Sequence, residues 1–182
     1  IARYPMYGQL TDVCLSKIGD GAIENRFQQV VERNDFSRLE KLLLLAIAPI
    51  FHKIRITPRT ALILSSTKGN ISALANGDSA PLLSTLAQKM ANAIGVTTTP
   101  IVVSNACVSG AMALSVADRL LKADAYDSAI VLAGDEISEF VLSGFQSFQA
   151  MSAQPCRPYD AQRDGITLGE ATAVAYVTRE AP

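Results

Sequence analysis

Three features of this sequence predict an α/β fold with a mostly parallel sheet and helices on both of its faces. Three runs of β-branched and aliphatic residues, at 60–66, 101–103 and 129–134, have the composition of buried strands. Stretches of helical character alternate with these runs along the chain. Apolar residues make up 49% of the 182 positions, which is enough for one domain with a sizeable core or for a piece of a larger one.

The region before the first of these runs predicts one strand and one helix. A short strand is expected at 13–18, ahead of a Gly-Asp-Gly turn. Asp35 or Ser37 is suited to cap a helix, with Glu40 in its first turn. This helix is expected to run to about residue 53, and Pro49 should bend it or end it early.

The rest of the chain predicts three further helices and a last strand. Ser79 and Pro81 favour the start of a helix at 80–94, and Gly95 favours its end. A stretch without proline, dominated by Ala and Leu, predicts a second helix. This second helix is expected at 108–122 and a third at 139–148. The last strand is expected at 173–177.

Composition excludes several classes of protein. A net charge of −1 and no basic stripe argue against a nucleic-acid partner, and no apolar run approaches the roughly 20 residues of a membrane span. Three irregularly spaced cysteines argue against a disulfide framework and suit the reducing cytoplasm. No residues have metal-ligand spacing, His52 is the single histidine, and no cofactor is predicted.

Cys107 lies at the corner between the strand at 101–103 and the helix at 108–122. Unpaired N–H groups and the positive end of the helix dipole favour a thiolate there, and the same N–H groups could hold a substrate oxyanion. This arrangement predicts a nucleophile elbow with sulfur in place of oxygen. The alternative is that Cys107 is a small buried hydrophobe, as free cysteines commonly are. The small residues that follow it favour a thin helix packed closely inside a protein.

A polar loop at 151–171 is the second candidate functional segment. Two prolines and Gly165 give it a structured character, just before the last strand. One interpretation is a surface loop with solvated ion pairs, which contribute little to stability. The other is a buried network that holds a site rigid, and the sequence favours the first. The charged residues concerned are Arg157, Asp160, Arg163, Asp164 and Glu170.

These two segments resemble the β-ketoacyl-acyl-carrier-protein synthases, or ketosynthases, of the thiolase-like superfamily. Residues 104–110, Ser-Asn-Ala-Cys-Val-Ser-Gly, resemble the nucleophile turn of that family. Arg157-Pro158-Tyr159-Asp160, Arg163-Asp164-Gly165 and Leu168-Gly169-Glu170 resemble its downstream loop, and residues 133–136 resemble the strand end between them. The resemblance covers roughly 59–178 and weakens before that, although residues 35–38 resemble the start of the family's first helix.

The resemblance implies the N-terminal half of a duplicated thiolase-like fold and a decarboxylating Claisen condensation. Cys107 would be the nucleophile and its backbone N–H one oxyanion donor, while the five charged loop residues would support the site structurally. The implied partner is an acyl carrier protein with phosphopantetheine-linked acyl and malonyl groups. The implied assembly is a homodimer or a paired heterodimer in the cytoplasm, in fatty acid or polyene/polyketide biosynthesis.

The sequence also departs from the family. Two histidines and a lysine are expected from the second half of the fold, and His52 matches neither histidine. The family's opening glycine-ended strand is not found either, so residues 1–182 are expected to be a piece of the domain. Asp135, Ala171 and Thr172 replace residues that are commonly glycine or lie in a glycine-rich stretch. These changes suggest a divergent subgroup.

Two alternative functions stay open beside the ketosynthase. One is a non-condensing partner subunit of the chain-length-factor type, and such partners usually lack the cysteine, so Cys107 argues against it. The other is a thiolase-superfamily acyltransferase that does not decarboxylate. Two histidines in the second half of the fold would identify a decarboxylating enzyme.

Overall fold

The protein is described by a computed structural model over residues 1–31, 35–76 and 82–179. It divides into two compact units. We call Ile1–Ala22 with Glu136–Glu170 the hairpin unit, and Ile23–Asp135 with Ala171–Pro182 the core unit. Within the described ranges, no helix is long and apolar enough to cross a lipid bilayer.

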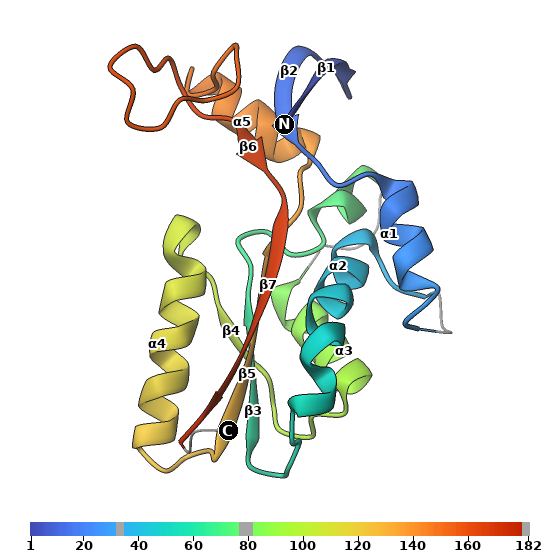
Figure 1. Ribbon diagram of the computed structural model, residues 1–182, viewed down its shortest axis with the longest axis vertical. Coiled ribbons are helices and arrows are strands. Elements are labelled where there is room, and N and C mark those ends of the chain that lie inside the picture. Colours follow the sequence, from blue (N-terminus) through green and yellow to red (C-terminus); the bar gives the residue numbers. More distant parts are fainter. Residues whose placement is uncertain (32–34, 77–81, 180–182) are drawn as a thin grey trace. The chain divides into compact units, whose positions relative to one another are not determined.

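The core unit is built on a four-stranded sheet with the order β4-β3-β5-β7 (Figure 1). Strands β3 and β4 are parallel, as are β3 and β5, whereas β7 runs antiparallel to β5. This arrangement confirms the predicted α/β class with a mostly parallel sheet. The strands are β3 (Thr60–Ser65), β4 (Ile101–Val103), β5 (Ser128–Asp135) and β7 (Ala171–Thr178).

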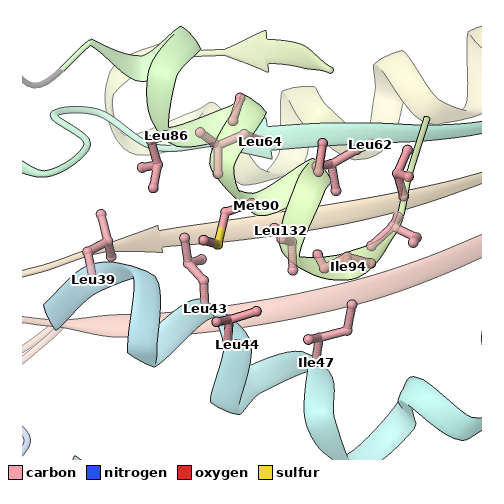
Figure 2. Close-up of a cluster of buried hydrophobic side chains, with 14 of the residues drawn as sticks. Leu39, Leu43, Leu44, Ile47, Leu62, Leu64, Leu86, Met90, Ile94 and Leu132 are labelled. Carbon is pink, nitrogen blue, oxygen red and sulfur yellow. The ribbon is translucent and has the colours of Figure 1, made fainter. Parts of the chain in front are cut away.

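Helices cover both faces of this sheet, as the sequence predicts. Helices α2 (Arg38–Ile47) and α3 (Leu83–Ile94) lie on one face and α4 (Ser109–Lys122) on the other (Figure 1). The side chains of β3 alternate between the two faces, and both sets are buried. Figure 2 shows the first core, in which Leu62 and Leu64 pack with side chains from α2, α3 and β5. The second core contains Ala61, Ile63, Ala113, Ala117 and Val131.

The start of α2 confirms the predicted cap. Ser37 is the N-cap, and its Oγ accepts the backbone N–H of Glu40, while the Glu40 carboxylate accepts the N–H of Ser37 at 2.7 Å. The helix ends at Ile47 and continues as the 3₁₀ helix η1 (Ala48–Lys53), which contains Pro49. Of the two predicted outcomes, a bend or an early end, the structure shows the early end of the α-helix before Pro49.

Two other predicted boundaries fall differently in the structure. Helix α3 ends at Gly95, which has a φ of 90°, as predicted, but it begins at Leu83; Ser79 and Pro81 lie outside the described residues. The turn predicted at 19–21 is wrong, because α1 (Asp20–Phe27) begins there. Asp20 favours a helix start, and Ile23 and Phe27 bury one face of α1.

The hairpin unit contains one strand that overlaps the strand predicted at 13–18, and two strands that were not predicted. Strand β1 (Ala2–Tyr7) pairs antiparallel with β2 (Leu10–Ser16), and β6 (Leu168–Gly169) pairs parallel with β2. Helix α5 (Glu139–Ser147) follows the predicted range closely. The Glu139 carboxylate accepts the N–H of Gln9 in the β1–β2 turn at 2.8 Å, which anchors that turn to the start of α5.

Candidate active site

Cys107 occupies a sharp turn between β4 and α4 in the core unit. Strand β4 ends at Val103, and Cys107 is the central residue of the 3₁₀ helix η3 (Ala106–Val108), which leads directly into α4. Ala106 has a φ of +46°, in the left-handed region that residues other than glycine rarely occupy. A non-glycine residue held in this conformation marks a backbone that the surrounding structure constrains.

Ser109 fixes this turn through hydrogen bonds to its backbone. Its Oγ accepts the N–H of Asn105 at 2.8 Å and donates to the carbonyl of Ala106 at 2.7 Å. The N–H of Val108 is taken up by the carbonyl of Asn105 at 3.2 Å. Among the described residues, no hydrogen bond engages the N–H of Cys107. This N–H group is therefore available to an oxygen atom of a bound substrate.

The three cysteines differ in accessibility. Cys107 is exposed, Cys156 is half-buried, and Cys14 is 3% exposed in β2 of the hairpin unit. The interpretation of Cys107 as a buried hydrophobe is wrong for this chain. Over the described ranges, no group of three histidine, cysteine or acidic residues could hold a metal ion.

Helix α4 is not packed on all sides within this chain, contrary to the expectation of a helix inside the protein. Ser109, Ala113, Ala117 and Leu121 form its buried face. Met112 and Leu114 in α4, and Val108 just before it, are exposed. The small residues serve the buried face, because they let α4 lie close to the sheet. A Cβ added to Gly110 would lie 4.0 Å from the Cβ of Ala133 in β5.

A second turn lies beside the Cys107 turn at the carboxyl end of the sheet. Ser65, the last residue of β3, pairs with Val103, the last residue of β4. The segment after β3, residues 66–69, is here called the Ser66 turn. Its N–H groups at Thr67 and Lys68 are bound by the Asp135 carboxylate, and the N–H of Gly69 is bound by the Ser66 Oγ. These three groups are therefore not free to form an oxyanion hole with Cys107.

Four of the predicted support residues lie on the surface of the hairpin unit. Arg157, Asp160, Arg163 and Asp164 are all exposed. The Arg157 guanidinium donates to the carbonyl of Gln162, and that of Arg163 donates to the carbonyl of Asp160 at 3.0 Å. A hydrogen bond from the Ser152 hydroxyl lowers the pKa of Asp164, with a smaller contribution from the charge of Arg157. These contacts shape the loop itself.

Glu170 differs from the other four because its side chain is buried. It is 6% exposed, and its carboxylate accepts the N–H of Ile18 at 2.6 Å and the N–H of Ile137 at 3.1 Å. Its own N–H donates to the carbonyl of Ser16 at 3.0 Å. Glu170 thus joins three segments of the hairpin unit. All five predicted support residues belong to this unit, whereas Cys107 belongs to the core unit.

Comparison with known families identifies the chain. The family model described as “Beta-ketoacyl synthase, N-terminal domain” matches residues 17–182. The chain belongs to this family. The match begins well before residue 59, where the main part of the resemblance starts, so it includes α1 and α2 as well as the Cys107 turn. The predicted ketosynthase resemblance and the N-terminal half of a thiolase-like α/β fold are thereby confirmed.

Solved ketosynthase structures share the fold at low sequence identity. One is a “Ketosynthase (ApeO) in Complex with its Chain Length Factor (ApeC) from Xenorhabdus doucetiae”, with 24% identity and a TM-score of 0.74 over 100% of this chain and 51% of that chain. “The ishigamide ketosynthase/chain length factor” has 18% identity and a TM-score of 0.68 over 97% of this chain and 54% of that chain. A β-ketoacyl synthase from Burkholderia phymatum has 19% identity and a TM-score of 0.63, covering 82% of this chain and 46% of that one.

This chain thus spans about half the length of these solved relatives. No curated protein matches its sequence. Sequence reasoning identified Cys107 but missed two residues that shape its surroundings. Ser109 could have been found from the sequence, because a serine hydroxyl at the start of a helix commonly binds nearby backbone groups. The contacts of Asp135 join segments far apart in the chain, so no local pattern predicts them.

Proposed function

We propose that this chain is the nucleophile-bearing half of a β-ketoacyl-acyl-carrier-protein synthase, an acyltransferase, with Cys107 as the residue that accepts the acyl group. The main support is the position of Cys107 within a ketosynthase N-terminal domain. Its thiol is exposed at the end of a parallel strand, and its N–H is not engaged among the described residues. An exposed nucleophile beside an open N–H group is the arrangement that acyl transfer requires.

In the first step, the acyl group moves from an acyl carrier protein to Cys107. The sulfur attacks the carbonyl carbon of a phosphopantetheine-linked acyl thioester, and the oxygen becomes an oxyanion. The N–H of Cys107 donates a hydrogen bond to this oxygen. The bond to the phosphopantetheine sulfur then breaks, and the released thiolate takes up the proton that Cys107 lost.

In the second step, a malonyl thioester extends the acyl group. The bond to the malonyl carboxylate breaks, carbon dioxide leaves, and the electron pair stays on carbon as an enolate. This carbon attacks the acyl carbonyl, a carbon–carbon bond forms, and Cys107 leaves as a thiolate. Decarboxylation needs groups that stabilise the enolate, and the one histidine here is poorly placed. His52 lies in η1, ahead of the amino end of β3, whereas Cys107 follows the carboxyl end of β4.

For assembly, we propose a homodimer or a paired heterodimer. Two of the solved relatives are described as a ketosynthase with a chain length factor. Strand β4 is at the edge of the core-unit sheet, and Ile101–Val103 is uncharged and half-buried. An edge strand of this kind is suited to an interface. We place the protein in the cytoplasm and its pathway in fatty acid or polyene/polyketide biosynthesis.

The function is tested with the full-length gene product that contains this chain. The protein is incubated with an acyl carrier protein bearing a radiolabelled acyl thioester, digested, and analysed by mass spectrometry. We expect one acyl adduct, on the peptide that contains Cys107, and none in Cys107→Ala. Cys156→Ala is the matched control and should retain the adduct. Absence of the adduct in the wild type would contradict the proposal.

Addition of malonyl-acyl carrier protein separates the alternatives. Release of carbon dioxide and formation of a β-ketoacyl product are expected for a ketosynthase. An adduct on Cys107 without carbon dioxide release would indicate a non-decarboxylating acyltransferase. A protein without an adduct that changes the product length of a paired ketosynthase would be a chain-length-factor-type subunit. The 182-residue chain alone is expected to form no β-ketoacyl product.

A further inference from the structure

Asp135, the last residue of β5, uses one carboxylate oxygen to bind the Ser66 turn. Its Oδ1 accepts the Ser66 hydroxyl at 2.9 Å, the Thr67 hydroxyl at 3.0 Å and the Thr67 N–H at 2.8 Å. It also accepts the Lys68 N–H at 3.3 Å. Ser66 is 1% exposed, so the loss of this acceptor would leave a buried hydroxyl poorly bonded. These four hydrogen bonds to one oxygen fix the backbone of the Ser66 turn.

The Ser66 turn is the neighbour of the Cys107 turn at the same end of the sheet. Strand β3 lies between β4 and β5, and Ser65 pairs with Val103 on one side and with Ala133 on the other. The close approach of Gly110 to Ala133 brings the start of α4 to the same end of β5. Three strand ends therefore meet here, and ligands bind at such carboxyl ends in α/β sheets. Asp135 binds the turn that follows the middle strand, β3.

The far side of the Ser66 turn is anchored by a second carboxylate. Asn70, directly after the turn, donates through Nδ2 to Glu40 Oε1 at 2.8 Å. Glu40 is 2% exposed and pairs with Lys89 at 2.7 Å. Gly69 has a φ of +61°, a left-handed conformation that glycine adopts without steric strain. The turn is thus fixed at both ends.

We propose that Asp135 is a positioning residue for acyl transfer, because it holds the Ser66 turn as a fixed wall beside Cys107. This inference rests on the proposed function of Cys107. The acyl thioester approaches Cys107 along this wall, so a turn that moves would misplace the carbonyl carbon. A misplacement of about 1 Å can cost a hundredfold in rate. Asp135 stands where the family resemblance leads one to expect glycine, so this contact belongs to this chain's own side chains.

The test compares Asp135→Ala and Asp135→Asn with the wild type in the full-length gene product. Single-turnover acylation of Cys107 is followed by mass spectrometry over a range of acyl-carrier-protein concentrations. We expect Asp135→Ala to lower the ratio of maximal rate to half-saturating concentration by about tenfold to a hundredfold. Asp135→Asn keeps an acceptor oxygen and should recover most of this loss. Asp118→Ala, which removes an exposed carboxylate on α4, is the matched control and should have no effect.

Two further readouts separate positioning from general damage to the fold. Iodoacetamide is small and does not need the wall, so its rate of reaction with Cys107 should be the same in all variants. Amide hydrogen exchange at Thr67 and Lys68 should accelerate in Asp135→Ala and stay slow in Asp135→Asn. Wild-type acylation kinetics in Asp135→Ala would overturn the proposal, as would an equal loss of iodoacetamide labelling. No adduct in the wild type would overturn the proposed function first, and this inference with it.

Discussion

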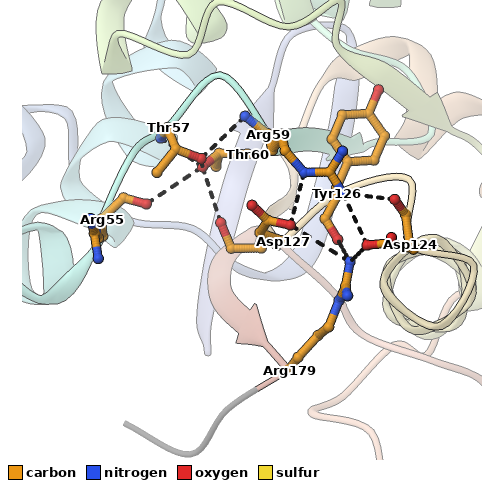
Figure 3. A network of polar contacts seen from close by, with 9 residues as sticks. Arg55, Thr57, Arg59, Thr60, Asp124, Tyr126, Asp127 and Arg179 are labelled. Carbon is orange, nitrogen blue, oxygen red and sulfur yellow. Dashed lines mark hydrogen bonds and ion pairs between the residues drawn. The ribbon is translucent and has the colours of Figure 1, made fainter.

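The two ends of the core-unit sheet use charged side chains differently. At the amino end, Arg59 and Arg179 pair with Asp124 and Asp127, as Figure 3 shows. The side chains in these pairs are between 40% and 73% exposed. At the carboxyl end, Asp135 binds the Ser66 turn, and it has no ion pair among the described residues. Glu40, which anchors the following residue, is almost fully buried.

This difference separates exposed charge from charge in a partly buried environment. At the amino end the guanidinium groups of Arg59 and Arg179 also donate to the backbone carbonyls of Asp124 and Tyr126, but their side chains are exposed. Exposed ion pairs are screened by water and salt and contribute little. A carboxylate that accepts several hydrogen bonds in a partly dry environment fixes the groups that it touches. The carboxyl end is also the end that presents Cys107, so the rigid carboxylate contacts lie where a reaction would need fixed geometry.

Thiol reactivity should differ most strongly between Cys107 and Cys14. Cys107 is exposed at the carboxyl end, whereas Cys14 is 3% exposed in the hairpin unit and reacts only when the structure opens. We expect iodoacetamide to label Cys107 at least about a hundredfold faster than Cys14 at neutral pH. Peptide mapping by mass spectrometry after timed quenching measures both rates. Equal or faster labelling of Cys14 would contradict the exposed-turn geometry.

Removal of the buried carboxylate at the carboxyl end should have the largest effect on stability. Glu40→Ala leaves Lys89 without its ion pair and Asn70 without an acceptor. We expect the free energy of unfolding to fall by about 2–3 kcal/mol, measured by urea denaturation. The Ser37 N–H and Asn70 each lose an acceptor, whereas Lys89 is 36% exposed and its charge can be solvated. Asp118→Ala, which breaks an exposed pair with Lys122, is the control and should leave stability almost unchanged. If Glu40→Ala lowers the free energy of unfolding no more than Asp118→Ala does, burial does not determine how much these contacts stabilise the protein.

Close packing at the carboxyl end gives the next effect. A Cβ on Gly134 would lie 2.5 Å from Thr172 Cγ2 and 3.2 Å from Leu43 Cδ2. We expect Gly134→Ala to lower the free energy of unfolding by about 1–3 kcal/mol, because β7 and α2 must shift. Gly144 in α5 has open space around it, so Gly144→Ala should be neutral or slightly stabilising. Thermal denaturation of both variants compares them, and an unchanged melting temperature for Gly134→Ala would contradict the packing described.

The smallest effect is expected at the amino end and depends on pH. The hydrogen bond and charge of Arg179 lower the pKa of Asp124, with a further contribution from Arg59. Because this folded-state pKa is lowered, the stabilisation is present above the ordinary aspartate range and is lost as pH falls through the folded pKa. Asp124→Asn should therefore be slightly less stable than the wild type near neutral pH, and the difference should be smaller at pH ~3. Urea denaturation at both pH values, with and without salt, checks this; a gap that widens in acid would contradict it.

Local patterns in the sequence predicted the elements that depend on local chemistry. The continuous apolar run of β3 and the Ser37–Glu40 capping box were both recognisable and are both present. Strand β1 was missed because most of its residues are exposed, so it has no apolar alternation. Helix α1 was missed because Gly19 and Gly21 suggest a turn.

The candidate site was predicted only as far as Cys107 itself. The strand, the turn and the helix around it follow from neighbouring residues. The bonds from Asp135 to the Ser66 turn cross between strands that are distant in sequence. Their existence depends on the order β4-β3-β5, which local composition does not encode. The catalytic assignment of Cys107 and the supporting role of the five loop residues stay predictions.

The acyl adduct on Cys107 is the decisive measurement. Full-length gene product is mixed with radiolabelled acyl-acyl carrier protein, quenched in acid and mapped by mass spectrometry. We expect one acyl group per chain on the peptide with Cys107, absent in Cys107→Ala and present in Cys156→Ala. A wild-type protein that stays unacylated, or an adduct that persists in Cys107→Ala, would contradict it.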